Sequence, residues 1–317
     1  MQMKIAVSGC LLGESVRFDS GHKRDDFVMD ELSGYAQYVS FCPENMAFSN
    51  PRPSIRLVKN ANESLKVESN KTGADLSAAL HEASLKDLQN IASHELRGII
   101  FKSKSPSCGL MSAKVYLENG FAEGKDDGVF AAMCRAKFPL LPMEEEGRLC
   151  DAWLRENFVM QLFAYDSFEK FKQNADMKEL VKFHTANKFL LHSKDEVLYR
   201  EMGNIVGNHE AKSFTQILRE YEFLFKTAIA KKSSKGKTRN VLEHMSGFVK
   251  SFLDAEEKAM LHEQIDDYAA QIIPLIVPLT TLKLYASKYG VSYLLEQTFL
   301  TPYPKELALR SSVKCVK

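Results

Sequence analysis

Three short strand-like stretches, each of which ends in a cysteine, constrain the fold of this chain more than any other feature. They are residues 4–10 (KIAVSGC), 35–42 (YAQYVSFC) and 98–108 (GIIFKSKSPSC). In a parallel α/β sheet the ligand crevice lies just beyond the carboxyl ends of the strands, so groups that follow different strands meet there. We therefore expect Cys10, Cys42 and Cys108 to converge, and three convergent thiolates indicate a metal site.

The pattern of apolar residues changes along the chain. Up to about residue 150 short apolar runs alternate with helical segments, including an expected helix over 129–137 and an expected last strand over 138–142. From about Trp153 onward three- and four-residue spacing dominates, most clearly over 214–229, and Asp254 with Glu257 predicts the capped start of a helix over 255–272. The predicted fold class is α/β: an N-terminal parallel-sheet, Rossmann-like domain (1–152) followed by an all-α helical domain (153–317).

Charge and hydropathy exclude several classes of function. The chain has 42 Lys+Arg and 41 Asp+Glu, a formal net charge of +1, which argues against a strongly basic nucleic-acid or membrane-surface protein. Its most apolar piece, residues 272–279, is short and contains Pro274 and Pro278, so no membrane span is expected. The N-terminus lacks a long apolar segment typical of secretion signals, and we expect a cytoplasmic protein.

The spacing of the cysteines favours one kind of metal group. Soft thiolates bind zinc, copper(I) or iron–sulfur clusters, and zinc sites usually contain a close pair such as C-x-x-C. Here the three cysteines lie on three different strands and are far apart in sequence, which favours an iron–sulfur cluster over zinc. The remaining cysteines, which end no strand, are expected to be structural or incidental: Cys134, Cys150 and Cys315.

Other polar groups have both a functional and an ordinary interpretation. Arg52 and Arg56, in an extended proline-rich segment, are either surface residues or an anion and substrate clamp. Residues 231–239 (KKSSKGKTR) form either a flexible solvated loop, which we favour, or a phosphate-binding loop. The histidines of the second half lack metal-ligand spacing, so surface or packing roles are expected for His184, His192, His209 and His244.

Several motifs resemble those of a known family. The stretches SGCLLGESVRFDSGHKR, CPE followed by NPRPSIRL, TGADL, KSKSPSCG and DDGVFAA resemble the thiouracil desulfidase family over residues 3–150. The downstream half, with LVKFHTANKFLLHS, TRNVLEHMSGFVK and IPLIVPLTTLK, resembles an uncharacterised helical domain that bacteria carry either fused to that family or encoded apart from it.

The resemblance implies a cofactor and roles for individual residues. It implies that Cys10, Cys42 and Cys108 hold a [4Fe-4S] cluster, with the fourth iron free to take the sulfur of a thiocarbonyl substrate. It also implies that Glu44 is the catalytic acid and base and that Ser105 relays protons, with Ser103 and Ser107 as the alternatives to Ser105.

The expected function is therefore a [4Fe-4S]-dependent desulfidase that replaces the sulfur of a small thiouracil-like thiobase by oxygen and releases sulfide. One alternative is a nucleic-acid or nucleotide-binding factor with a structural or sensory metal site, in which the helical domain contacts nucleotide or RNA through residues 231–239. The other is a zinc or cysteine hydrolase that uses Cys108 as its nucleophile.

Overall fold

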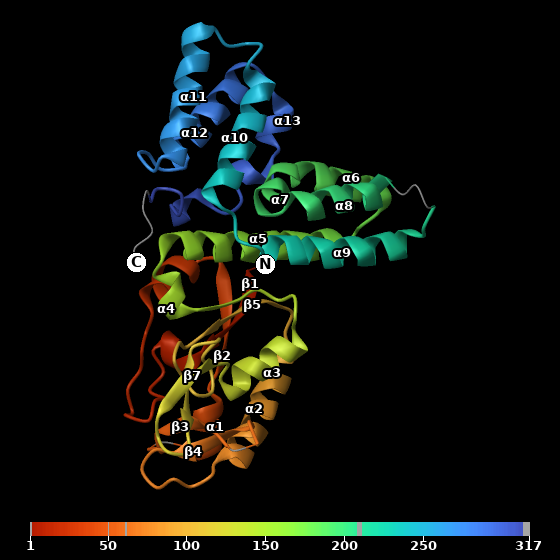
Figure 1. Cartoon of the computed structure of the whole chain (residues 1–317). Helices are drawn as coiled ribbons and strands as arrows, with labels where there is room; N and C mark the ends of the chain where they lie inside the picture. Colours follow the sequence, from red (N-terminus) through yellow and green to blue (C-terminus); the bar gives the residue numbers. More distant parts are fainter. Residues whose placement is uncertain (1, 50, 61, 208–210, 313–317) are drawn as a thin grey trace. The chain divides into compact units, whose positions relative to one another are not determined.

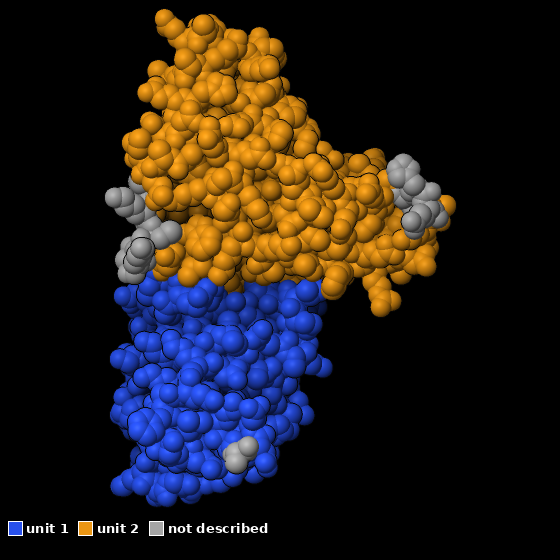
Figure 2. Space-filling view, viewed as in Figure 1, with its two compact units in different colours: residues 1–150 blue, residues 151–317 orange. Residues whose placement is uncertain are grey.

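The computed structural model describes residues 2–49, 51–60, 62–207 and 211–312. The chain forms two compact units, residues 1–150 and 151–317, which Figure 2 shows in different colours. The first is an α/β unit that contains a parallel sheet and the second is helical, as predicted from the sequence. None of the described helices combines the length and apolar character needed to cross a membrane.

A four-stranded parallel sheet is the frame of the first unit (Figure 1). Its order is β2-β1-β5-β8, with β1 at Met3–Ser8, β2 at Ala36–Phe41, β5 at Leu96–Phe101 and β8 at Met143–Glu145. The central strand β1 is a continuous apolar run because parallel strands are covered on both faces, and Ile5 and Val7 are fully buried. The carboxyl ends of β1, β2 and β5 consequently lie side by side.

Helices α2 (Ser77–Ala92) and α3 (Val129–Lys137) pack beside one another against this sheet (Figure 1). The core that they close contains three aromatic rings, in which the centroids of Phe41 and Phe130 are 4.8 Å apart and those of Phe41 and Phe101 are 5.8 Å apart. This packing fixes β2 and β5 immediately before the loops that carry two of the cysteines.

The second sheet of this unit was not predicted from the sequence. It has the order β4-β3-β6-β7, with β3 at Ile55–Lys59, β4 at Leu65–Ser69, β6 at Ala113–Leu117 and β7 at Ala122–Asp126. Strands β3 and β6 are parallel and the outer pairs are antiparallel. The remaining elements of the unit are short: η1 Gly9–Leu12, η2 Phe27–Leu32, α1 Pro43–Phe48 and α4 Glu146–Leu149.

The strand expected over residues 138–142 is wrong. These residues form turns, and β8 follows them at Met143–Glu145. Pro139 and Pro142 cannot donate ladder hydrogen bonds, whereas the residues after them can. The acidic side chains of β8 are tolerated because they have partners: Arg148 donates to Glu144, and the backbone of Leu110 donates to Glu145.

The second unit is built of helices. Its elements are α5 Ala152–Lys172, α6 Met177–Ala186, α7 Lys188–Lys194, α8 Glu196–Gly207, α9 Phe214–Ala230, α10 Lys235–Val249, α11 Ala255–Ala269, α12 Ile276–Lys288, α13 Ser292–Leu295, η3 Thr298–Leu300 and η4 Lys305–Leu307. The predicted apolar stripe is confirmed in α9, where Ile217, Tyr221 and Phe225 are buried. The predicted cap is also confirmed, since Asp254 and Glu257 form a capping box at the start of α11.

The flexible loop expected over residues 231–239 is wrong in its second half. Ser234 caps helix α10, which begins at Lys235, so the glycine and lysines after it are helical. Three of the basic side chains have partners inside the unit: Lys231 pairs with Asp195, Lys237 donates to the carbonyl of Lys194, and Arg239 pairs with Glu243 and Asp266. Residues that are fixed in this way cannot act as a solvated tether.

Candidate functional site

Three cysteines stand at the carboxyl ends of three neighbouring strands of the parallel sheet. Cys10 lies in η1, directly after β1, and Cys42 is the residue before α1, directly after β2. Cys108 follows β5 by way of a polar loop. Since β1 pairs with both β2 and β5 in parallel register, these three positions share one edge of the sheet. The convergence expected from strand order is therefore found in the structure.

The three thiols line a single cavity of about 560 Å³. All three are free, as are the other two described cysteines, Cys134 and Cys150. Burial raises the pKa of the Cys10 thiol to about 11 and that of Cys42 to about 12, and it raises the pKa of Cys108 well above its ordinary value. Thiols with a raised pKa are protonated at neutral pH, and a bound cation favours their ionised form.

The three thiols are soft ligands of the kind that bind metal groups. Within the described residues no group of three or more His, Cys, Asp or Glu side chains is close enough to hold one metal ion. The three thiols instead surround a cavity, and soft sulfur ligands are the type that iron–sulfur clusters use. Cys10, Cys42 and Cys108 are thus the residues that could hold such a cluster.

Glu44 is a buried carboxylate beside Cys42, held at both of its oxygens. It lies in the first turn of α1, after Pro43, and is 7% exposed. Oε2 forms an ion pair with Arg52, whose Nε also donates to the carbonyl of Val16 over 3.1 Å. Oε1 accepts hydrogen bonds from two serines of the loop after β5. The side chain of Arg52 is 6% exposed, so this is a buried ion pair.

Two of the three candidate serines reach Glu44. The hydroxyl of Ser105 is 2.9 Å from Oε1, that of Ser107 is 2.5 Å from the same oxygen, and the two hydroxyls are 2.9 Å apart. Ser103 contacts a different carboxylate; its backbone N–H and its hydroxyl donate to Glu146. The geometry leaves Ser105 and Ser107 as partners of Glu44, and the importance of Ser107 was underestimated from the sequence.

Ser105 also shapes the loop that carries Cys108. Its hydroxyl oxygen accepts hydrogen bonds from the backbone N–H groups of Ser107 and Cys108, each over 3.2 Å. Ser107 is 1% exposed, and its hydroxyl lies 3.4 Å from the Cys108 sulfur. One short segment thereby places a thiol and two hydroxyls around the same point.

Gly128 allows this loop to approach the start of α3. A Cβ at Gly128 would lie 2.5 Å from the carbonyl carbon of Ser107 and 2.8 Å from the nitrogen of Cys108. The backbone of Gly128 has φ −65°, which any residue adopts, so the requirement for glycine is one of space alone. The sequence predicts a helix that begins directly after Gly128 but gives no signal for this contact, because the two segments are remote along the chain.

The cavity carries an excess of positive charge. Its lining includes one carboxylate, that of Glu44, and the cations Arg17, Lys23, Arg52, Lys102 and Lys104. Of the two arginines proposed as a clamp, only Arg52 lines the cavity. Arg56 lies in β3, where it pairs with Glu68 and stacks against Tyr116, so its assignment to one rim with Arg52 is wrong.

The other candidates from the sequence have structural surroundings. Cys134 is fully buried in the aromatic core, whereas Cys150 is exposed and Cys315 lies outside the described residues. His184 packs flat against Tyr199, and burial lowers its pKa to about 4. His192 and His244 contact each other edge to face, and His209 lies outside the described residues.

Comparisons with known proteins divide the chain in the same way. A family model described as 2-thiouracil desulfurase matches residues 5–146, and one described as a protein of unknown function (DUF1722) matches residues 188–304. The uncharacterized protein YbgA of Escherichia coli (strain K12) is 26% identical over 161 residues, which cover 50% of this chain and 94% of YbgA. A solved structure, the [4Fe-4S]-dependent thiouracil desulfidase TudS, is 27% identical with a TM-score of 0.37 and covers 47% of this chain and 93% of TudS.

Proposed function

Because residues 5–146 belong to the 2-thiouracil desulfurase family and residues 188–304 to the DUF1722 family, we propose that this protein is a desulfidase of small thiobases. The reaction replaces the thiocarbonyl sulfur of a thiouracil-like base by the oxygen of water and releases hydrogen sulfide. Atoms balance with water as the only co-reactant, and no electrons are transferred. The observation that carries the proposal is the meeting of three free thiols and the buried carboxylate of Glu44 at one cavity.

The proposed cofactor is a [4Fe-4S] cluster held by Cys10, Cys42 and Cys108. When bound, the cluster supplies an iron with an open position, a Lewis acid suited to a soft sulfur atom. The support for this assignment is the chemistry of the three free thiols and their placement around a cavity.

Glu44 is the proposed acid and base. Its Oε2 is held by Arg52, so Oε1 is the oxygen that takes a proton from water and later returns it. The hydroxyls of Ser105 and Ser107 are each within hydrogen-bond distance of Oε1 and lie 2.9 Å from each other, which gives the proton a path of two hydroxyls. Arg52 also orients the carboxylate, because its Nε is anchored on the carbonyl of Val16.

The cavity supports a small-molecule substrate. Its volume of about 560 Å³ is typical of sites for small ligands and leaves room for a planar base beside the cysteines. Asn70 and Ser54 line the same space and offer groups that pair with the polar edge of a heterocycle. The free thiols and the proposed cluster suit a reducing compartment, and we place the protein in the cytoplasm.

The structure offers little support for the two alternative functions, a nucleic-acid-binding factor and a zinc or cysteine hydrolase. A nucleotide or RNA contact rested on a flexible basic loop, most of which is helical or paired within its own unit. A cysteine hydrolase of the Cys–His type needs a histidine beside its nucleophile, but none of the residues that line the cavity is a histidine, and burial raises the pKa of the Cys108 thiol. Neither alternative is favoured by a specific contact.

The test is anaerobic purification of the full chain, followed by iron and sulfide analysis and incubation with 2-thiouracil. We expect a brown protein with cluster absorption that converts the base and releases sulfide. Glu44→Gln removes the charge but keeps the shape, so we expect it to retain the cluster and lose turnover by roughly 10²–10⁴-fold. Glu118→Gln, at an exposed carboxylate in the turn after β6, is the matched control and keeps the full rate.

Two outcomes contradict the proposal. A colourless protein that takes up zinc after careful reconstitution with iron and sulfide would eliminate the cluster. An iron-loaded Glu44→Gln variant as active as Glu118→Gln would remove Glu44 from the mechanism.

A further inference from the structure

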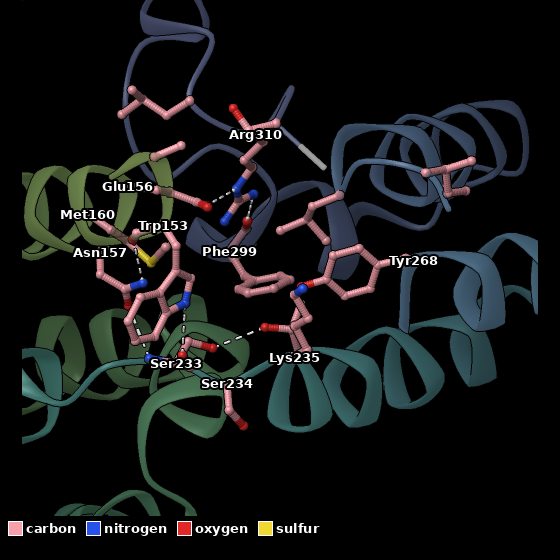
Figure 3. Close-up of a pocket in the computed structure, with 16 residues that line it drawn as sticks. Trp153, Glu156, Asn157, Met160, Ser233, Ser234, Lys235, Tyr268, Phe299 and Arg310 are labelled. Atoms are coloured by element: carbon pink, nitrogen blue, oxygen red, sulfur yellow. Dashed lines mark hydrogen bonds and ion pairs between the residues drawn. The ribbon is translucent and has the colours of Figure 1, made fainter. Parts of the chain in front are cut away.

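A second cavity lies wholly within the helical unit and takes no part in the proposed reaction (Figure 3). It has a volume of about 70 Å³ and is lined by α5, the start of α10, the end of α11 and the segment after η4. Trp153 and Phe299 form aromatic walls, and Glu156, Lys235 and Arg310 are the charged residues of its lining.

Arg310 brings an unused hydrogen-bond donor into this cavity. Its side chain is 5% exposed; Nε donates to Glu156 over 2.8 Å, and Nη1 donates to the carbonyl of Phe299 over 2.6 Å. Nη2 is buried and has no hydrogen-bond partner among the described residues. Figure 3 shows Arg310 extending toward the space between Trp153 and Phe299. Because a buried charged donor without an acceptor is costly, a ligand oxygen at this point stabilises it.

The start of helix α10 adds further positive potential to the same cavity. The helix is 15 residues long and has no acidic residue in its first turn. Its first residue, Lys235, is half-buried and lines the cavity, and the hydroxyls of Ser233 and Thr238 lie 3.0 Å apart on the same wall. The positive end of a helix dipole with free N–H groups is a favourable place for an anion.

The balance of charge selects an anion, and the volume selects a small one. Glu156 is neutralised by its ion pair with Arg310, which leaves the ammonium group of Lys235 and the helix dipole in excess. A cavity of about 150 Å³ accommodates benzene, so one of about 70 Å³ is too small for a six-membered ring. The volume therefore favours a tetrahedral oxyanion over a thiobase.

We propose that this cavity is a binding site for a small free oxyanion, inorganic phosphate or sulfate. The anion accepts hydrogen bonds from Nη2 of Arg310 and from the ammonium group of Lys235, and it faces the start of α10. The site goes beyond the proposed desulfidase reaction and does not depend on it, since every residue involved belongs to the helical unit.

The chain contains its own reporter for this site. Trp153 is the single tryptophan of the sequence and forms a wall of the cavity. Titration of the intact protein with sodium phosphate, at constant ionic strength set by sodium chloride, should give a saturable change in tryptophan fluorescence. Sodium sulfate should give the same response, and uridine 5′-monophosphate, whose nucleoside is too large for the cavity, should bind at least tenfold more weakly.

Substitutions test which residues hold the anion. Lys235→Ala should weaken phosphate binding by roughly tenfold, since it removes one charge-assisted hydrogen bond. Lys250→Ala removes an equal charge from the other end of α10 and should leave the affinity unchanged. Arg310→Lys should also weaken binding, and circular dichroism will show whether that variant remains folded; if it does not, Lys235→Ala still decides.

The proposal is overturned if phosphate gives no saturable change beyond that of chloride, or if Lys235→Ala binds phosphate as tightly as Lys250→Ala. Binding of uridine 5′-monophosphate as tight as that of phosphate would overturn the size limit and with it the assignment to a free oxyanion. The outcome of the thiouracil assay does not affect the interpretation of these binding measurements.

Discussion

Gly128→Ala tests whether the position of the Cys108 loop controls activity. The added methyl group would lie 2.5 Å from the carbonyl carbon of Ser107, where ordinary van der Waals contact begins at 3.4 Å. The difference, 3.4 − 2.5 = 0.9 Å, is the distance by which backbone must move. The backbone cannot yield freely, because Gly128 donates to the carbonyl of Gly109 over 2.7 Å and Phe130 donates to that of Ser107 over 2.9 Å.

The displaced atoms are those that hold Cys108 and the serines opposite Glu44. A misplacement of about 1 Å in a catalytic site costs roughly 100-fold in rate, or about 2.7 kcal/mol in the activation barrier. Overpacking costs a further 1–3 kcal/mol of folding free energy, roughly, so a lower melting temperature should accompany the slower turnover.

The assay is sulfide release from 2-thiouracil, normalised to iron content, together with thermal unfolding. Gly124→Ala is the matched control, because a Cβ at that position of β7 meets nothing within 4 Å. The reasoning is refuted if Gly128→Ala has the rate and the melting temperature of Gly124→Ala. A lower melting temperature without any thiouracil turnover in the parent protein would support the packing argument and count against the proposed function.

Three further predictions follow from the same structure. Arg52→Gln removes the ion pair that holds Oε2 of Glu44 and should slow turnover roughly tenfold or more. Arg56 pairs with Glu68 instead, so Arg56→Gln is the control and should keep the parent rate. Equal rates in the two variants would contradict the orienting role of Arg52. Ser105→Ala and Ser107→Ala should both slow turnover. Only Ser105→Ala should also lower the iron content, because the Ser105 hydroxyl accepts hydrogen bonds from the backbone of the loop that carries Cys108. Ser103→Ala is the control, since the Ser103 hydroxyl donates to Glu146. Lys194, buried beside Asn157, has its pKa lowered by burial from 10.5 to about 7, with Glu156 opposing and Arg310, Lys237 and Lys232 adding to the shift. The unfolded chain therefore binds more protons between pH 7 and 10.5, so stability due to this group rises with pH across that window, by at most about 5 kcal/mol. In Lys194→Met the free energy of unfolding, measured by urea denaturation followed by Trp153 fluorescence, should not rise with pH across this window. Identical pH profiles of stability in the variant and the parent protein would contradict the prediction.

The arrangement of the cysteines could be predicted because it depends on local signals. Each strand is an apolar run that ends at a glycine, a proline or a polar loop, and parallel order brings such ends to one edge. The same reasoning predicted α3 and the cap of α11 closely, because turn and capping residues act within a few positions of the chain.

The features that were missed depend on contacts between remote residues. Glu44 and Ser107 are 63 positions apart, and no local pattern pairs them. The second sheet joins β3 and β6 across more than 50 residues, so its strands were not recognised as partners. The composition of residues 231–239 is typical of a linker and predicts a loop. The structure of this segment is instead determined by the cap at Ser234 and by contacts of its side chains with other helices.

The short helix α1 couples the positions of two groups of this site. Cys42 and Glu44 flank Pro43 at its start, so a proposed cluster ligand and the proposed base are carried by three consecutive residues with a fixed φ between them. Any rotation of this helix moves both groups together, and substitutions at the two positions should not be additive. A displacement of α1 would therefore perturb the proposed cluster ligand and the proposed base together, whereas a single substitution such as Glu44→Gln changes only one of them.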